Sequence, residues 1–141
     1  MHPFEVKTGS RECLVDITSR VQQAVAASGL VSGVCTVYVP HTTAGVTINE
    51  NADPDVCRDL VAFLGELVPR DWRFRHGEGN SDAHVKASLL GASAQVPVEG
   101  GRLTLGTWQG IFFAEFDGPR TRQVRVVVVG SWGHHGRETS P

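Results

Sequence analysis

Three helical segments interrupt a chain that otherwise consists of short β-rich stretches, and this irregular order limits the possible folds more than any other feature of the sequence. Thr18 is a suitable N-cap for the first helix, and Gly29 stands where a left-handed C-cap belongs. Asp53 and Pro54 form a strong helix start, and Ser81 is a suitable N-cap for the third helix. The predicted helices span residues 18–28, 54–68 and 82–91.

Extended patterns account for most of the remaining chain. The predicted strands span residues 4–8, 13–17, 32–39, 45–49, 94–99, 102–105, 108–116 and 123–129. The first two are separated by Gly9-Ser10, which can turn, so we expect them to form a hairpin. The stretch 126–129 is apolar on both faces, and we expect it to be covered on both sides, in the core or at a subunit contact. Strand runs broken by helices in this order predict an α+β fold with a largely antiparallel sheet.

The length of 141 residues fits one domain and excludes a (β/α)8 barrel, which needs about 200 residues or more. We assign this domain to residues 1–132 and expect the polar segment 133–141 to be a flexible tail. Thirteen Lys and Arg residues against fifteen Asp and Glu give a net charge of −2, which argues against non-specific binding to nucleic acid or to membranes.

Cys13, Cys35 and Cys57 show no disulfide or metal-binding spacing. We expect each to be unpaired and to act as a small buried hydrophobic residue. The N-terminus lacks the pattern of a signal peptide, and the longest apolar run is too short to span a bilayer. These features together predict a cytoplasmic protein.

Three of the six histidines stand at junctions where side chains often line a site. His41 follows a predicted strand, His76 lies in a glycine-containing loop, and His84 falls in the first turn of a predicted helix. Neutral imidazole is the commonest metal ligand, so the three could share a divalent ion. The alternative is that each is an ordinary hydrogen-bonded histidine, because no local motif such as HExxH is present. His134 and His135 are expected to be solvated tail residues.

Polar residues also gather in front of two helices. Glu50 and Asn51 precede the second helix and have no evident structural role, whereas Asp53 is simply a good N-cap. Asn80 and Ser81 precede the third helix, whose free N–H groups could hold an anion such as a phosphate.

A third polar cluster flanks the apolar strand predicted in the last third of the chain. Gln109 lies at its start and Glu115 at its end, and Glu115 shares a strand face with Asp117. Arg120 and Arg122 follow, and arginine is suited to bidentate binding of phosphate. A solvated turn with arginine–carboxylate pairs is the alternative.

Three long motifs stand in the same order as the signatures of a known family. They are His41-Thr42-Thr43-Ala44 with Ile48 to Val56, Glu78-Gly79-Asn80 with Ala83 to Gly91, and Leu105 to Ile111 with Glu115 to Arg120. The chain resembles the YjbQ-like family, whose members are called secondary thiamine-phosphate synthase enzymes, from about Phe4 to Val129. Glu78 and Ala83 depart from a common variant of the second signature, which has Asp and Ser there.

The resemblance implies a compact α+β domain with a mixed, barrel-like β core and about three helices, assembled as a homotrimer. It implies an enzyme, a secondary thiamine-phosphate synthase that joins a pyrimidine diphosphate to a thiazole phosphate and releases pyrophosphate. It also implies that a divalent metal, zinc or magnesium, could be bound by His41, His76 and His84.

In this interpretation Glu50, Glu115 and Asp117 are the candidate catalytic residues, which would stabilise the cationic pyrimidine or ligate the metal. The candidates for binding substrate or phosphate are Asn51, Asn80, Ser81, Gln109, Arg120 and Arg122. We expect the three histidines to meet in one pocket with Glu50, Asn80, Asp117 and Arg120, near a subunit boundary.

Two other functions stay open at this point. One is a metal-dependent hydrolase of a small phosphorylated metabolite, in which water replaces the thiazole. The other is a non-catalytic trimer that binds an anion or another small ligand in the same polar cluster.

Overall fold

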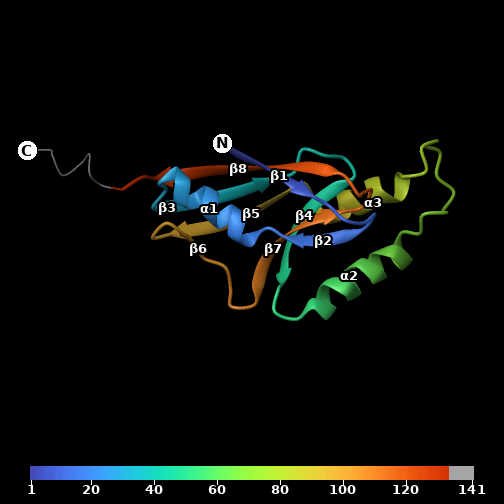
Figure 1. Ribbon diagram of the computed structural model, residues 1–141, viewed down its shortest axis with the longest axis horizontal. Helices are drawn as coiled ribbons and strands as arrows, with labels where there is room; N and C mark the ends of the chain where they lie inside the picture. The colour runs from blue at the N-terminus through green and yellow to red at the C-terminus, as the bar shows by residue number, and fades with distance from the viewer. Residues whose placement is uncertain (134–141) are drawn as a thin grey trace, which may run out of the picture.

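The strands form two antiparallel sheets in the computed structural model, which describes residues 1–133 (Figure 1). The five-stranded sheet has the order β1-β8-β3-β5-β6, and the three-stranded sheet has the order β2-β7-β4. The strands are β1 (His2–Lys7), β2 (Cys13–Asp16), β3 (Ser32–Tyr38), β4 (Ala44–Glu50), β5 (Ser93–Glu99), β6 (Arg102–Leu103), β7 (Gln109–Glu115) and β8 (Thr121–Ser131). The α+β class is confirmed, with the strands divided between two sheets.

Three helices complete the domain: α1 (Thr18–Ser28), α2 (Pro54–Leu67) and α3 (Ser81–Leu90). Their bounds lie within one residue of those predicted. The Asp53 side chain caps α2 by accepting a 2.9 Å hydrogen bond from the backbone N–H of Asp55. Gly29 ends α1 at φ 77°, a left-handed conformation that glycine adopts without steric cost.

The two other predicted caps are wrong by one residue. Ile17 is the N-cap of α1, while Thr18 lies inside the helix and its hydroxyl accepts the backbone N–H of Ile111 at 2.8 Å. Asn80 is the N-cap of α3 and Ser81 its first residue. The hydroxyl of Thr18 therefore joins α1 to β7.

A single large apolar cluster lies between α1 and the strands. The helix contributes Val21 and Val25, and β7 contributes Ile111 and Phe113, all four without exposed surface. Fully burying an aliphatic or aromatic side chain of this size contributes about 1.5–3 kcal/mol each. A smaller cluster of Ala83, Ala87, Ala114 and Phe116 anchors α3 to β7, and so holds the start of α3 against the sheet.

The predicted hairpin of β1 and β2 is wrong. Phe4 of β1 lies opposite Val124 of β8, and Leu14 of β2 lies opposite Ala114 of β7. The two strands thus belong to different sheets, because each finds a longer partner far along the chain. The segment between them crosses from one sheet to the other.

Strand β8 is covered on one side only in the single chain. Val126 is buried, but Val127 is 39% and Val129 is 68% exposed on the opposite face. The expectation of cover on both sides therefore fails within this chain, and the subunit contact stays a prediction.

Helix α2 lies along the outside of the molecule beside the three-stranded sheet (Figure 1). None of its residues is buried, and Phe63 and Leu67 on its predicted inner face are more than half exposed. The apolar stripe of α2 predicts the helix correctly but not its burial.

Cys13, Cys35 and Cys57 are free, as expected, although only Cys35 is buried. Burial raises the pKa of the Cys35 thiol to about 11. Among the described residues, no helix combines the length and apolar character needed to cross a membrane. Of the predicted tail 133–141, residues 134–141, including His134 and His135, lie outside the described residues.

Candidate functional site

Side chains from separate parts of the chain line a polar cavity of about 490 Å³. They come from the loop after β3, the loop before α3, the first turn of α3, the turn that joins β7 to β8, and the start of β8. Of the predicted site residues, the cavity brings together His41, His76, His84, Asn80, Asp117, Arg120 and Arg122. The three histidines therefore do meet in one pocket, although they are far apart in sequence.

Arg122 is the most deeply placed charged group of this cavity. Its side chain is only 3% exposed, and Glu115, with no exposed surface, pairs with it. Arg122 Nε donates to Glu115 Oε1 at 2.8 Å, Nη2 donates to Oε2, and Nη2 also donates to the hydroxyl of Thr43 at 2.8 Å. Nη1 takes part in none of the hydrogen bonds among the described residues, so it is free to donate to a ligand.

Glu115 serves to orient Arg122 and does not face the cavity. It also accepts hydrogen bonds from the Thr8 hydroxyl at 2.9 Å and from the backbone N–H of Asp117 at 3.0 Å. Burial alone would raise the pKa of Glu115, but the hydrogen bonds from Arg122, Asp117 and Thr8 outweigh it and hold the pKa below its ordinary value. Glu115 was predicted to stabilise the pyrimidine or to ligate a metal, but it is not among the residues that line the cavity, and its acceptor positions are used within the protein.

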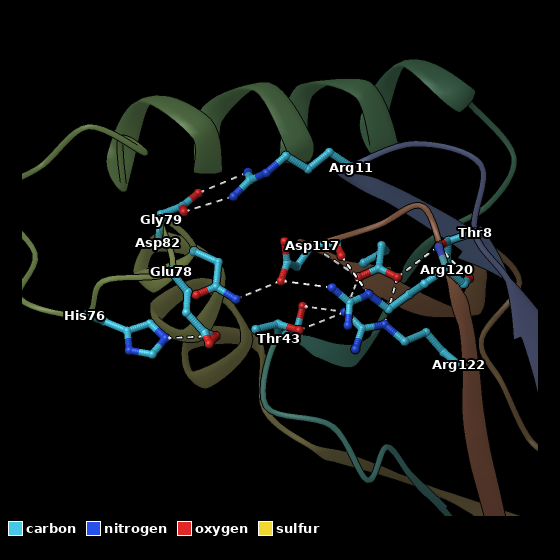
Figure 2. Close-up of polar contacts among 12 residues, drawn as sticks. Thr8, Arg11, Thr43, His76, Glu78, Gly79, Asp82, Asp117, Arg120 and Arg122 are labelled. Atoms are coloured by element: carbon cyan, nitrogen blue, oxygen red, sulfur yellow. Dashed lines mark hydrogen bonds and ion pairs between the residues drawn. The ribbon is translucent and has the colours of Figure 1, made fainter.

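Asp117 links the turn after β7 to the start of α3 (Figure 2). Its Oδ2 accepts from Asn80 Nδ2 at 2.8 Å and from Arg120 Nη2 at 3.2 Å. Arg120 also donates from Nε to the backbone carbonyl of Asp117 at 2.9 Å. The side chain of Arg120 is half exposed, so its guanidinium can reach a bound anion while remaining anchored.

His41 is held in one neutral form. Its Nε2 accepts a 2.9 Å hydrogen bond from the backbone N–H of Gln123, which leaves the proton on Nδ1. Burial lowers the pKa of His41, and the nearby Arg122 lowers it further. At neutral pH this histidine therefore acts as an N–H donor.

His76 and His84 lie on the other side of the cavity. Their rings meet edge to face with centroids 5.4 Å apart, and His76 Nε2 lies 3.5 Å from a carboxylate oxygen of Glu78. Figure 2 shows His76 and Glu78 apart from the cluster of Asp117, Arg120 and Arg122.

The donor set does not fit a metal held by all three histidines. A neutral imidazole has one lone pair on nitrogen, and that of His41 is used by Gln123. Within residues 1–133, no three side chains of His, Cys, Asp or Glu stand close enough together to bind one ion.

A family described as UPF0047 protein YjbQ-like matches residues 2–131. This chain belongs to the YjbQ-like family. The expected family is thus confirmed. The match itself assigns no activity.

The UPF0047 protein MJ1081 of Methanocaldococcus jannaschii is 54% identical over 127 residues, covering 90% of this chain and 92% of the relative. The UPF0047 protein YugU of Bacillus subtilis is 51% identical over 128 residues, covering 90% of this chain and 97% of the relative.

Solved structures of YjbQ-like proteins share the fold. A Clostridium acetobutylicum member superposes with a TM-score of 0.90 at 51% identity, covering 92% of this chain and all of the other. A Sulfolobus solfataricus member, described as of unknown function, gives a TM-score of 0.89 at 36% identity, covering 92% of this chain and 96% of the other.

Three predicted site residues of this YjbQ-like protein lie elsewhere. Glu50 pairs with Gln109 at the end of β4 and β7 that is remote from His41, about 20 Å away along the strand. Gln109 uses its side-chain oxygen to accept the backbone N–H of Gly106. Asn51 packs so closely on Gly110 that an added Cβ there would lie 2.7 Å from its amide nitrogen. Asn51 and Gln109 shape the turn before β7, and none of these three residues lines the cavity. Ser81 is also not among the residues that line the cavity.

The cavity includes residues that were not assigned a role from the sequence. Thr42 and Glu78 line it, and Thr43 positions Arg122. Thr42 and Thr43 directly follow His41, and Glu78 stands two residues before Asn80. Their place in these motifs is the sequence feature that could have indicated a role in the site.

A buried charge network between α3 and the segment before β2 was also not predicted from the sequence. Asp82 accepts two hydrogen bonds from Arg11, at 3.1 and 3.2 Å, and one from Lys86 at 2.9 Å, while Lys86 also donates to Glu12. Burial alone would raise the pKa of Asp82, but its bonds to Arg11 and Lys86 hold it below the ordinary value. The four-residue spacing of Asp82 and Lys86, which places both on one face of α3, is the sequence feature that could have indicated their ion pair. The network ties α3 to the segment before β2.

Proposed function

We propose that this YjbQ-like protein is an enzyme that binds the phosphate or diphosphate of a small metabolite in the polar cavity and acts as a thiamine-phosphate synthase. The observation that supports it best is Arg122, a buried guanidinium that lines the cavity and is held rigid by Glu115 and Thr43. A guanidinium fixed in this way is pre-organised to bind an oxyanion, because little side-chain entropy remains to be lost.

The reaction would use these residues to stabilise charge. As the bond between the pyrimidine methylene carbon and the diphosphate oxygen breaks, negative charge grows on the leaving diphosphate. Arg122, Arg120 and the Nδ1–H of His41 would donate hydrogen bonds to it. The thiazole nitrogen then forms the new bond to that carbon, and pyrophosphate leaves. Asp117, beside Arg120 in the polar cavity, is the carboxylate available to stabilise the positive charge on the methylene carbon next to the diphosphate.

Each arginine is already paired with a carboxylate, Arg122 with Glu115 and Arg120 with Asp117. The cavity therefore attracts anions through directed N–H groups more than through net charge. Such donors select a ligand by the positions of its oxygen atoms. This suits the binding of one kind of phosphorylated metabolite, whereas attraction by net charge alone would bind any polyanion.

Turnover by the purified protein tests the proposal. With a pyrimidine diphosphate and a thiazole phosphate supplied together, we expect thiamine phosphate and pyrophosphate in equal amounts. His84→Ala should lower the rate at least about tenfold, because His84 lines the cavity as a further histidine that would donate a proton or a hydrogen bond to the leaving pyrophosphate. The unfolding midpoint should stay near that of the wild type, because His84 is only partly buried. His2→Ala, outside the cavity, is the control.

Other outcomes separate the rival functions. Phosphate released without the thiazole would favour a hydrolase, and a dependence on added zinc or magnesium would favour the metal-dependent one. Tight binding without any product would favour a non-catalytic binding protein. Activity of His84→Ala that falls only with its folded fraction would show that His84 has a structural role.

A further inference from the structure

A second cavity of about 520 Å³ adjoins the polar one. The two share His41, Thr42 and His84, so they form one cleft with two halves. We call the part with Arg120 and Arg122 the polar half. The other part, the small-residue half, is lined in addition by Ala44, Ala87, Ser88, Gly91 and Ala92.

Close packing of the backbone creates the small-residue half. A Cβ on Gly45 of β4 would lie 2.6 Å from the carbonyl oxygen of Gly91, so β4 and the end of α3 approach closely only because residue 45 is glycine. Gly91 itself has φ 98°, and a Cβ added there would meet nothing within 4 Å. The backbone at Gly91 is thus open to the cleft.

The two halves differ in chemistry. Beyond the two shared histidines, the small-residue half is lined by no charged side chain among the described residues. A charged group placed there would lose water without gaining a partner, whereas an apolar group would gain about 25 cal/mol per Å² of buried surface. Short side chains and bare backbone also let the flat face of a ring approach closely.

We propose that the small-residue half holds the uncharged body of the substrate, a compact flat group of about one aromatic ring, while its phosphate occupies the polar half. This inference rests on the proposed function, because it requires the phosphate to bind in the polar half. His41 and His84, which line both halves, then flank the bond between the ring-bearing group and the phosphate.

The test compares inorganic phosphate with phenyl phosphate in an NMR titration of the ¹⁵N-labelled full-length protein. We expect phenyl phosphate to bind about tenfold more tightly, because a phenyl ring adds roughly one buried side chain of apolar surface. Both ligands should shift the amide signals of Arg120 and Arg122, and only phenyl phosphate should shift those of Gly91 and Ala92.

A matched pair of variants locates the ring. Ser88 is exposed and lines the small-residue half, so Ser88→Phe should fill it and remove the preference for phenyl phosphate while inorganic phosphate still binds. Leu89→Phe, on the adjacent exposed position outside the cleft, should keep the preference. Ala92→Leu offers a second way to fill the same space.

The outcomes are distinct. Equal affinities in the wild-type protein, or a preference that survives in both Ser88→Phe and Ala92→Leu, would overturn the ring site and leave the phosphate site standing. Failure of both ligands to bind the wild-type protein would overturn the proposed function, and this inference with it.

Discussion

The backbone N–H of Gln123 donates a 2.9 Å hydrogen bond to Nε2 of His41, and these residues lie 82 positions apart in the chain. The bond joins the loop after β3 to the beginning of β8. It also presents the Nδ1–H of His41 as a donor, because a neutral imidazole carries one proton. One backbone contact thus determines what this histidine can bind.

His41 should therefore titrate at lower pH than a free histidine, whose pKa is about 6.5. Folding favours its neutral form, because burial and Arg122 both disfavour the imidazolium. Its contribution to stability is present above pH about 6.5 and is lost as the pH falls through the folded-state pKa. An NMR titration of the imidazole signals measures this pKa. A value at or above that of free histidine would contradict the effect assigned to burial and Arg122.

Glu115→Gln should destabilise the protein by about 3–5 kcal/mol, because it leaves the buried Arg122 without a counter-charge. Urea unfolding at pH 7 measures the loss. Since folding lowers the pKa of Glu115, its contribution is present above the unfolded-state pKa and is lost as the pH falls through the folded-state pKa. The cost of Glu115→Gln should therefore shrink at low pH. A cost below about 1 kcal/mol at pH 7 would show that the pair is dispensable.

Lys86→Met should also cost about 3–5 kcal/mol, because Asp82 loses one of its two cationic partners while remaining fully buried. Lys7→Met, at an exposed lysine with no ion pair among the described residues, is the control and should change the stability by less than about 0.5 kcal/mol. If both variants unfold at the same urea concentration, the buried network does not stabilise α3.

The sequence predicts the helices well because their signals are local. A cap such as Asp53, or a glycine such as Gly29, acts on the residues next to it. The pairing of β1 is different, because its alternating pattern fits β2 and β8 equally well and only the whole fold decides between them. The buried partners of Lys86 also come from a remote segment.

The dependence on contacts between remote segments also explains which site residues were predicted correctly. Polar groups stand at both ends of β4 and β7, and the sequence does not say which ends meet. The antiparallel register places Glu50 opposite Gln109 at one end and Ala44 opposite Glu115 at the other. His41, Asp117, Arg120 and Arg122 lie near the end with Ala44 and Glu115. Glu50 lies at the opposite end and is therefore not part of the cavity.

A trimer remains our expectation for the assembly. Val34 of β3 lies opposite Val129 of β8, and both are exposed on the outer face of the five-stranded sheet. Light scattering should give three times the chain mass of 15.2 kDa. Val129→Lys places a charge on this face and should lower the mass toward that of one chain. A wild-type protein that is monomeric at micromolar concentration would contradict the trimer.

Calorimetric titration with pyrophosphate tests the central claim, that the cavity with Arg120 and Arg122 binds phosphate groups, most directly. The wild-type protein should bind one pyrophosphate per chain. Arg120→Gln should weaken binding at least about tenfold, because a charge-assisted hydrogen bond contributes about 1.5–3 kcal/mol. Arg102→Gln, at an exposed arginine of β6 outside the cavity, should bind as the wild type does. Equal affinities in all three proteins, or no binding by the wild type, would contradict the account.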